Sequence, residues 1–144
     1  MPAPFVEEIY TANVTVEGGR EGRARNADGT LDLQLVTPGD DETTTIGTNP
    51  EELFAAGYAA CFQSALGLVA SAEEIDTSAS RIDASVTLGK DADEHYDLAV
   101  TLRLTIPGVD AATARRLVEA AHQICPYSRA TRGNIDVQLD VVTN

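Results

Sequence analysis

Residues 53–70 form the most apolar stretch of the chain, within a helical pattern that continues to Ser71, and the segment Asn49–Glu52 immediately precedes it. Asparagine is a favoured N-cap, proline suits the first helical position, and Glu52 stands where a capping box places an acid. The sequence therefore predicts a helix over both segments. Because apolar residues occupy nearly its whole circumference, we expect this helix to be central and buried. Gln63, Ser64 and two glycines argue against a membrane span.

Alternating apolar and polar residues on both sides of this helix predict β-strands. Upstream, the alternation covers Tyr10–Glu17 and Leu31–Val36, and an Asp28-Gly29 turn signal precedes the second run. Downstream, Ile82–Leu88 and Leu98–Ile106 alternate in the same way. We expect these two to be long antiparallel strands with one face toward solvent.

A second, amphipathic helix is predicted from Asp110, a suitable cap, to about Ile124, with Pro126 ending it. Ile135–Val141 then alternates as a final strand. This order of strands and helices predicts an α+β fold in a single domain over residues 1–144. One buried helix with so many one-faced strands is too little cover for a monomer, so we expect a homodimer.

Length and charge exclude several classes of function. A chain of 144 residues fits one domain with a real core. The first ten residues lack the basic patch and apolar run of a secretion signal, which favours the cytoplasm. The net charge is −13, from 10 basic and 23 acidic residues. Such a charge repels phosphate backbones, so no nucleic-acid partner is expected. No membrane partner is expected either, because the apolar stretch is interrupted by polar residues and glycines.

The chain contains two cysteines, Cys61 and Cys125, which are too few for a disulfide-stapled secreted domain. They are either two packed hydrophobic side chains or a redox pair. Cys61 lies about three turns into the first helix, where the helix dipole gives little help. Burial there would raise the thiol pKa, so Cys61 becomes reactive only if a cation reaches it. Cys125 ends the second helix, a position that disfavours a thiolate.

Two charged residues are candidates for activating Cys61. Arg20 lies in the glycine-rich corner Gly18–Arg23, where tight turns could direct an arginine inward, although a solvated turn charge is the simpler interpretation. Glu51, in the first turn of the first helix, is either a dipole-stabilising acid or an anchor that orients an arginine. A metal site using His122 and Cys125, with His95 and Cys61 as further ligands, is an alternative without any finger-like spacing.

Four segments of the chain resemble the signature blocks of the organic hydroperoxide resistance proteins, within the wider superfamily that also includes the OsmC proteins. They are Gly18–Arg23, Thr48–Phe62, Ala121–Ser128 and Ala130–Asn134. The resemblance covers essentially the whole chain, and its Cys-Pro-Tyr-Ser block favours the first branch over the OsmC branch.

Departures from the family pattern are small. Glu21 stands where Asp is common, Glu52 where Gln is common and Arg129 where Asn is usual. The loop Pro38–Gly47 is acidic and rich in threonine instead of glycine. Substrate preference is the property that this loop leaves open.

The resemblance implies an intertwined homodimer in which antiparallel sheets wrap around central helices. It also implies a dithiol peroxidase without metal, haem or other cofactor. By the family pattern, Cys61 is the peroxide-reactive thiol and Cys125 its resolving partner, while Arg20 activates Cys61 and Glu51 anchors the arginine. The expected reductant is a lipoylated protein or dihydrolipoamide.

Physical reasoning makes these roles coherent. An arginine against Cys61 offsets the desolvation of its thiolate and can donate to a peroxide oxygen. The attack leaves a sulfenic acid, which a second thiol condenses to a disulfide. An apolar site around Phe54, Tyr58 and Phe62 would prefer alkyl or fatty-acid hydroperoxides over hydrogen peroxide.

Three alternatives remain open at this stage. The first is an OsmC-type peroxidase with broader substrates and another reductant. The second is a catalytically silent module that binds apolar ligands, in which both thiols stay reduced. The third, a peroxide-sensing repressor, is disfavoured because neither a recognition helix nor a basic surface is visible.

Overall fold

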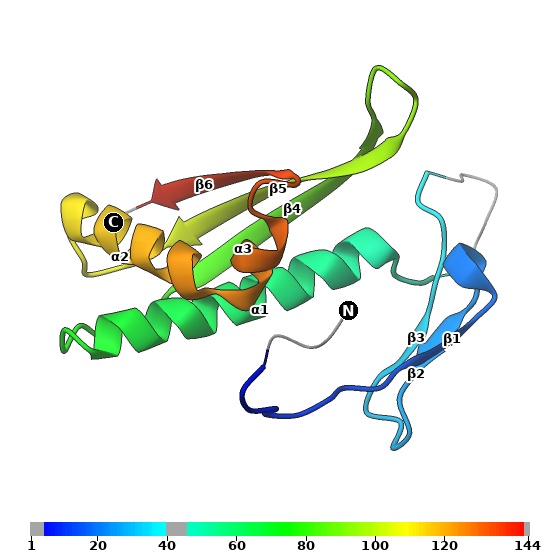
Figure 1. The fold of residues 1–144 in the computed structure, drawn as a ribbon, viewed down its shortest axis with the longest axis horizontal. Helices are drawn as coiled ribbons and strands as arrows, with labels where there is room; N and C mark the ends of the chain where they lie inside the picture. Colours follow the sequence, from blue (N-terminus) through cyan, green and yellow to red (C-terminus); the bar gives the residue numbers. More distant parts are fainter. Residues whose placement is uncertain (1–4, 40–45, 143–144) are drawn as a thin grey trace. The chain divides into compact units, whose positions relative to one another are not determined.

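The computed structural model describes residues 5–39 and 46–142. The chain forms two compact units, Met1–Pro50 and Glu51–Asn144. Three-stranded sheets occur in both, and the long helices follow the first sheet, so the predicted α+β class is confirmed (Figure 1). The single domain over residues 1–144 stays a prediction. Of the expected loop Pro38–Gly47, residues 40–45 lie outside the described part of the chain.

The first unit contains an antiparallel sheet in the order β1-β2-β3. Its strands are short: β1 is Thr15–Glu17, β2 is Arg23–Arg25 and β3 is Asp32–Gln34. The predicted strand Tyr10–Glu17 is therefore too long. Among residues 5–39 and 46–142, partners are found only for its last three residues, and without a partner strand alternation alone does not make a strand.

The glycine-rich corner between β1 and β2 holds a short 3₁₀ helix, η1, over Gly19–Glu21. Gly18 and Gly19 both have positive φ angles, 82° and 59°, which side-chain-bearing residues rarely adopt. A Cβ atom on Gly22 would lie 1.7 Å from the carbonyl oxygen of Glu17. The glycines are thus required by the tight turn, and the turn presents Arg20 on the surface of this unit.

The sheet of the second unit has the order β4-β5-β6, formed by Arg81–Lys90, Tyr96–Thr105 and Asp136–Val142. β4 and β5 are antiparallel, as predicted. β6 is parallel to β5, so the expectation of purely antiparallel sheets is wrong. The reason is that α2 and α3 connect β5 to β6. This helical crossover carries the chain back to the end of the sheet where β5 begins, and such crossovers join parallel strands.

Helix α1, Pro50–Ser71, packs one face into the core of the second unit (Figure 1). Its buried residues recur at helical spacing, and they are Tyr58, Phe62, Ala65, Leu66 and Ala70. They meet the inward side chains of β5, Val100, Leu102 and Leu104, in one cluster. By length and composition α1 could also cross a membrane, but this packed face is that of a core helix.

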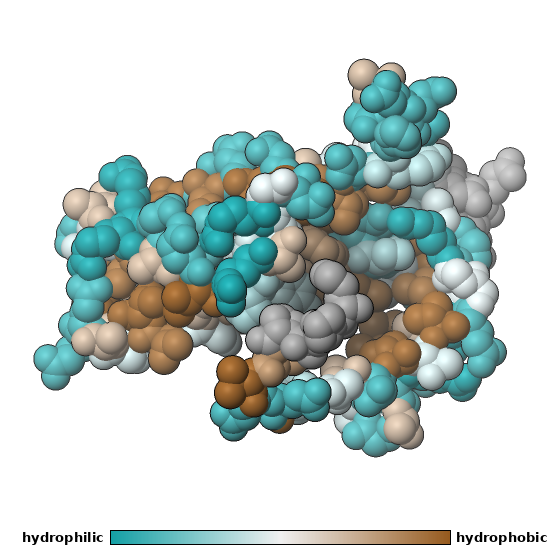
Figure 2. Space-filling model, in the orientation of Figure 1, coloured by the Kyte–Doolittle hydropathy of each residue, from teal (hydrophilic) through white to brown (hydrophobic). Residues whose placement is uncertain are grey.

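The prediction that α1 is buried all round is wrong within the single chain. Ala56, Ala60 and Leu68 are exposed, with Leu68 at 67%. Figure 2 shows apolar side chains at the surface over the C-terminal half of this helix. The physical reason is that the one sheet of this unit covers one face only, so the opposite apolar face has no cover from it.

Helix α2, Ala111–Ile124, agrees with the prediction, including its cap: the Asp110 side chain accepts a hydrogen bond from the Thr113 backbone N–H. A third helix, α3 over Pro126–Thr131, was not predicted. Pro126 does not merely end α2, because it also occupies the first turn of α3. Cys125 is the single residue between the two helices.

The packing of α1 gives a stability prediction. Leu66 is fully buried, so Leu66→Ala should lower the free energy of unfolding by about 2–5 kcal/mol. Leu66→Met conserves volume and should cost less than about 1.5 kcal/mol. Urea unfolding followed by circular dichroism measures both. Equal small effects for the two variants would contradict the described core.

Candidate functional site

The two cysteines, 64 positions apart in sequence, lie side by side in the second unit. The Sγ atoms of Cys61 and Cys125 are 3.7 Å apart, and both thiols are free. Cys61 comes from the middle of α1 and is half-buried, whereas Cys125 is fully buried at the α2–α3 bend. A disulfide bond needs sulfur atoms about 2.0 Å apart, so the two thiols are in contact with each other but not bonded.

The backbone around Cys125 explains why a thiol can sit at this bend. Cys125 has φ −61° and ψ 122°, an extended conformation that breaks the helix path. Its own N–H still donates to the Ala121 carbonyl, and its carbonyl accepts from the Arg129 N–H. Proline at 126 favours extended backbone at the residue before it and a helical start after it. The bend is therefore built into the sequence and satisfies its backbone groups.

Burial dominates the electrostatics of Cys61. It raises the pKa of the thiol above its ordinary value of 9.0, and the neighbouring Cys125 raises the pKa further. The backbone N–H of Tyr127 acts in the opposite direction, because its hydrogen bond to the sulfur favours the thiolate. Within the second unit alone, Cys61 is thus a neutral thiol at neutral pH.

Aromatic side chains belong to the same hydrophobic cluster as the two thiols. The rings of Phe54, Tyr58 and Tyr127 lie with centroids 5.6–6.2 Å apart. A Cβ atom on Gly57 would lie 2.9 Å from the Tyr127 hydroxyl, so this glycine makes room for the ring against α1. Tyr58 and Phe62, which were predicted to contact substrate together with Phe54, are fully buried. Their substrate role stays a prediction.

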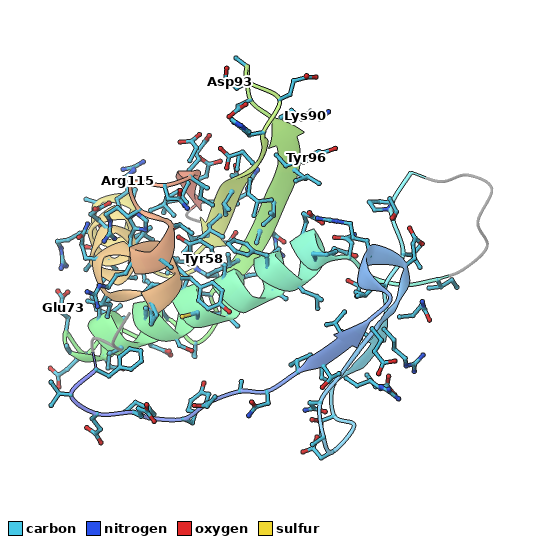
Figure 3. The ribbon with its side chains drawn as sticks, turned by 45° about the vertical axis from the view of Figure 1, so that its right-hand side comes forward. Tyr58, Glu73, Lys90, Asp93, Tyr96 and Arg115 are labelled. Atoms are coloured by element: carbon cyan, nitrogen blue, oxygen red, sulfur yellow. The ribbon has the colours of Figure 1, made fainter. Side chains whose placement is uncertain are left out.

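A buried network of hydroxyl groups ties α1 to the α2–α3 bend. Tyr58 Oη lies 2.9 Å from Ser128 Oγ and 3.2 Å from Thr131 Oγ1, and Figure 3 shows Tyr58 extending from α1 toward these helices. Ser128 Oγ also lies 2.8 Å from His122 Nδ1. Burial lowers the pKa of His122, and the nearby Arg132 cation lowers it further while Glu119 opposes the change. His122 is therefore neutral at neutral pH.

The two charged candidates lie in different units. Arg20 is on η1 of the first unit, and Glu51 is a partly buried residue in the first turn of α1. Each makes interactions of its own. Their pairing with each other and with Cys61 stays a prediction.

The metal alternative gains no support from the described residues. Among the described residues, one group of three potential metal ligands has its ligand atoms within 4.8 Å of one another: Asp91, Asp93 and His95. All three are exposed at the tip of the β4–β5 hairpin, where Figure 3 labels Asp93. His95 is thus grouped with aspartates and not with the cysteines. His122, the other histidine, directs Nδ1 to Ser128.

Sequence reasoning missed three contributors to this site: Tyr127, Ser128 and Thr131. Tyr127 acts on the Cys61 sulfur through its backbone N–H, a contribution that the residue type does not reveal. Ser128 and Thr131 follow Cys125 by one turn and nearly two turns of α3. The Cys-Pro-Tyr-Ser block contains Ser128 and the block Ala130–Asn134 contains Thr131. Only recognition of Pro126 as a helix start would have placed the two hydroxyl groups on one side of α3.

Comparison with known proteins identifies relatives over most of the chain. Residues 38–140 match the family described as OsmC-like protein. The organic hydroperoxide resistance protein OhrA of Bacillus subtilis is 48% identical over 94% of this chain and 97% of its own. The organic hydroperoxide resistance protein of Xanthomonas axonopodis pv. citri is 49% identical, over 91% and 93%. The crystal structure of OhrB from Bacillus subtilis superimposes with a TM-score of 0.87 at 46% identity, covering 94% and 100%.

The different burial of the two thiols gives a labelling prediction. In folded protein, iodoacetamide should modify Cys61 at least about tenfold faster than Cys125, because access limits the buried thiol. Peptide mass mapping during the reaction measures both rates. In urea the two rates should become similar, and Cys61→Ser should remove the fast phase. Fast labelling of Cys125 in the folded protein would contradict the described burial.

Proposed function

This chain belongs to the OsmC-like family, among its organic hydroperoxide resistance proteins, and we propose that it is a thiol peroxidase that reduces organic hydroperoxides to alcohols. One observation carries the proposal: two free thiols from distant parts of the sequence stand 3.7 Å apart, one of them half-buried and the other fully buried. The names of the relatives supply the substrate class, organic hydroperoxides.

In the proposed reaction Cys61 is the nucleophile. Its thiolate attacks the terminal oxygen of the hydroperoxide, the O–O bond breaks, and the alkoxide leaves as the alcohol after taking up a proton. Cys61 is then a sulfenic acid. The Cys125 thiol attacks the Cys61 sulfur, an S–S bond forms, the S–O bond breaks, and water leaves. The short distance between the sulfurs supports this second step.

Arg20 is proposed to activate Cys61, with Glu51 as its anchor. Burial raises the pKa of Cys61, and the Tyr127 N–H offsets only part of this effect. A neutral thiol is a poor nucleophile, so the site requires a cation. An arginine held against the sulfur by a carboxylate would supply the positive charge and also donate to the peroxide oxygens.

The apolar surroundings of Cys61 support alkyl and fatty-acid hydroperoxides as substrates. Phe54 is partly buried and Tyr127 partly exposed, so these two rings can receive an alkyl chain. Tyr58 and Phe62 are buried behind them and form the apolar base of the site. Hydrogen peroxide, which has no alkyl group, would gain nothing from these contacts.

Re-reduction of the disulfide requires a dithiol, for which we propose a lipoylated protein or dihydrolipoamide. Such a cycle belongs in the cytoplasm, where thiols are kept reduced. The protein is proposed to act as a homodimer. The exposed apolar face of α1, which includes Ala56, Ala60 and Leu68, supports this assembly, because a second copy would cover it.

The peroxidase proposal predicts that the protein consumes cumene hydroperoxide when dihydrolipoamide is the reductant. Cys61→Ser should abolish turnover because it removes the nucleophile. Cys125→Ser should still react once with peroxide and stop at a sulfenic acid that dimedone traps. Peroxide loss and intact-protein mass follow these outcomes.

Two results would redirect this proposal. No consumption by the wild type, with both thiols still free after stoichiometric hydroperoxide, would favour the silent binding module. Turnover with thioredoxin at rates equal to those with dihydrolipoamide would favour an OsmC-type peroxidase with another reductant.

The Arg20 proposal predicts a change in pH dependence. In Arg20→Ala the thiol pKa is set by burial and lies above 9.0, so the peroxide reaction should rise with pH only in that alkaline range. The wild type should reach its plateau at lower pH. At neutral pH the variant should be about tenfold to a hundredfold slower. Stopped-flow rates of Cys61 oxidation between pH 5 and about 10 measure this.

Arg25→Ala is the matched control, because Arg25 is an exposed arginine of the same unit on β2. Its pH profile should equal that of the wild type. An unchanged profile in Arg20→Ala would remove Arg20 from the mechanism without affecting the role of Cys61.

A further inference from the structure

The side chains around the Cys125 bend form a chain of four hydrogen bonds whose hydrogen atoms can be counted. The contacts are His122 Nδ1 to Ser128 Oγ, Ser128 Oγ to Tyr58 Oη, Tyr58 Oη to Thr131 Oγ1, and Thr131 Oγ1 to the Ser128 carbonyl. The three hydroxyl residues are buried, between 0% and 5% exposed. In such a place an unmade hydrogen bond is costly, so every contact should be satisfied.

The count fixes the direction of each bond. A carbonyl only accepts, so the single hydrogen of the Thr131 hydroxyl goes to the Ser128 carbonyl. Tyr58 must then donate to Thr131, and Ser128 must donate to Tyr58. Ser128 has no hydrogen left for His122. All four contacts are hydrogen bonds only if His122 carries its hydrogen on Nδ1 and donates it to Ser128.

Residues of this network lie on both sides of Cys125 in the sequence. His122 lies three residues before Cys125 on α2, and Ser128 lies three residues after it on α3, so their hydrogen bond spans the bend. Tyr58 lies three residues before Cys61 on α1, so its hydroxyl joins the same bend to the other cysteine's helix. The network therefore joins the α2–α3 bend, which holds Cys125, to α1, which holds Cys61.

We propose that His122, as the Nδ1–H tautomer, and Ser128 are positioning residues that hold Cys125 where it can resolve the oxidised Cys61. This inference rests on the proposed peroxidase function. It concerns only the second step, in which Cys125 attacks the Cys61 sulfenic acid, an S–S bond forms and water leaves. No further oxidant is required, because the hydroperoxide has already oxidised Cys61. Holding two reacting groups in place accelerates such a step, and small displacements slow it strongly.

The test measures the two steps separately after one equivalent of cumene hydroperoxide. Quenched-flow samples treated with dimedone report the sulfenic acid, and the loss of two hydrogens in the intact mass reports the disulfide. Ser128→Ala should slow disulfide formation by about tenfold or more, while sulfenic acid formation stays within about twofold of the wild type. Equal slowing of both steps, or an unchanged second step, would overturn the proposal.

Two substitutions of His122 distinguish the nitrogen atoms. An asparagine amide can occupy the place of Nδ1, whereas a glutamine amide reaches the place of Nε2. His122→Asn should therefore keep disulfide formation within about threefold of the wild type, and His122→Gln should slow it like Ser128→Ala. If both variants behave alike, the donor at Nδ1 has no role in positioning.

A measurement on protein with the network intact covers the case in which a variant fails to fold. The chain has two histidines, and His95 is exposed on the β4–β5 hairpin, so His95→Gln leaves His122 as the single histidine signal. Nitrogen-15 NMR near neutral pH should show a protonated Nδ1 and an unprotonated Nε2. The opposite tautomer would overturn the inference. Absence of any sulfenic acid or disulfide in the wild type would instead refute the peroxidase function, a result that the other measurements do not produce.

Discussion

The packing of one face of α1 against the sheet and the α2–α3 bend is the constraint on which the site depends. It brings the Cys61 sulfur to 3.7 Å from that of Cys125 and buries the inner residues of α1 and α2 in one cluster. The apolar contacts of Phe62, Leu66 and Leu117 fix the distance between α1 and α2. The hydrogen bond of the Tyr58 hydroxyl to Ser128 fixes where α3 lies along the length of α1. Apolar burial supplies the stability here, and the buried hydroxyl groups add direction, because hydrogen bonds require specific partners.

The same burial creates an electrostatic conflict at Cys61. An apolar environment suits an alkyl hydroperoxide, the proposed substrate, but penalises the thiolate that attacks it in the proposed mechanism. The Tyr127 backbone N–H reduces this penalty through one hydrogen bond to the sulfur, and no side chain is needed for it. Cys125 cannot help, because a second thiol at this distance raises the pKa of Cys61 further. The second unit thus holds the two thiols that are proposed as nucleophile and resolving partner, and in that proposal the activating charge comes from Arg20.

Local signals in the sequence predicted much of this arrangement. The cap at Asp110, the helix start at Pro50 and the β4–β5 pair all follow from short-range chemistry that each segment carries by itself. Two features were not predictable in that way. The parallel pairing of β6 depends on the path of the helical crossover, and α3 depends on Pro126 serving as a start and not only as a stop. The bond between His122 and Ser128 exists only because the chain bends between them.

The bend also bears on how far the two sulfur atoms must move in the proposed disulfide step. Formation of the proposed disulfide would shorten the distance between the sulfurs from 3.7 Å by roughly 1.7 Å. Rotation of a cysteine side chain about its Cα–Cβ bond can supply a displacement of that size, so neither helix has to unfold. For this to work the backbone at Cys125 must stay fixed while its side chain turns. A residue between two helices, with its N–H and carbonyl both hydrogen-bonded and a buried network on either side, meets that requirement.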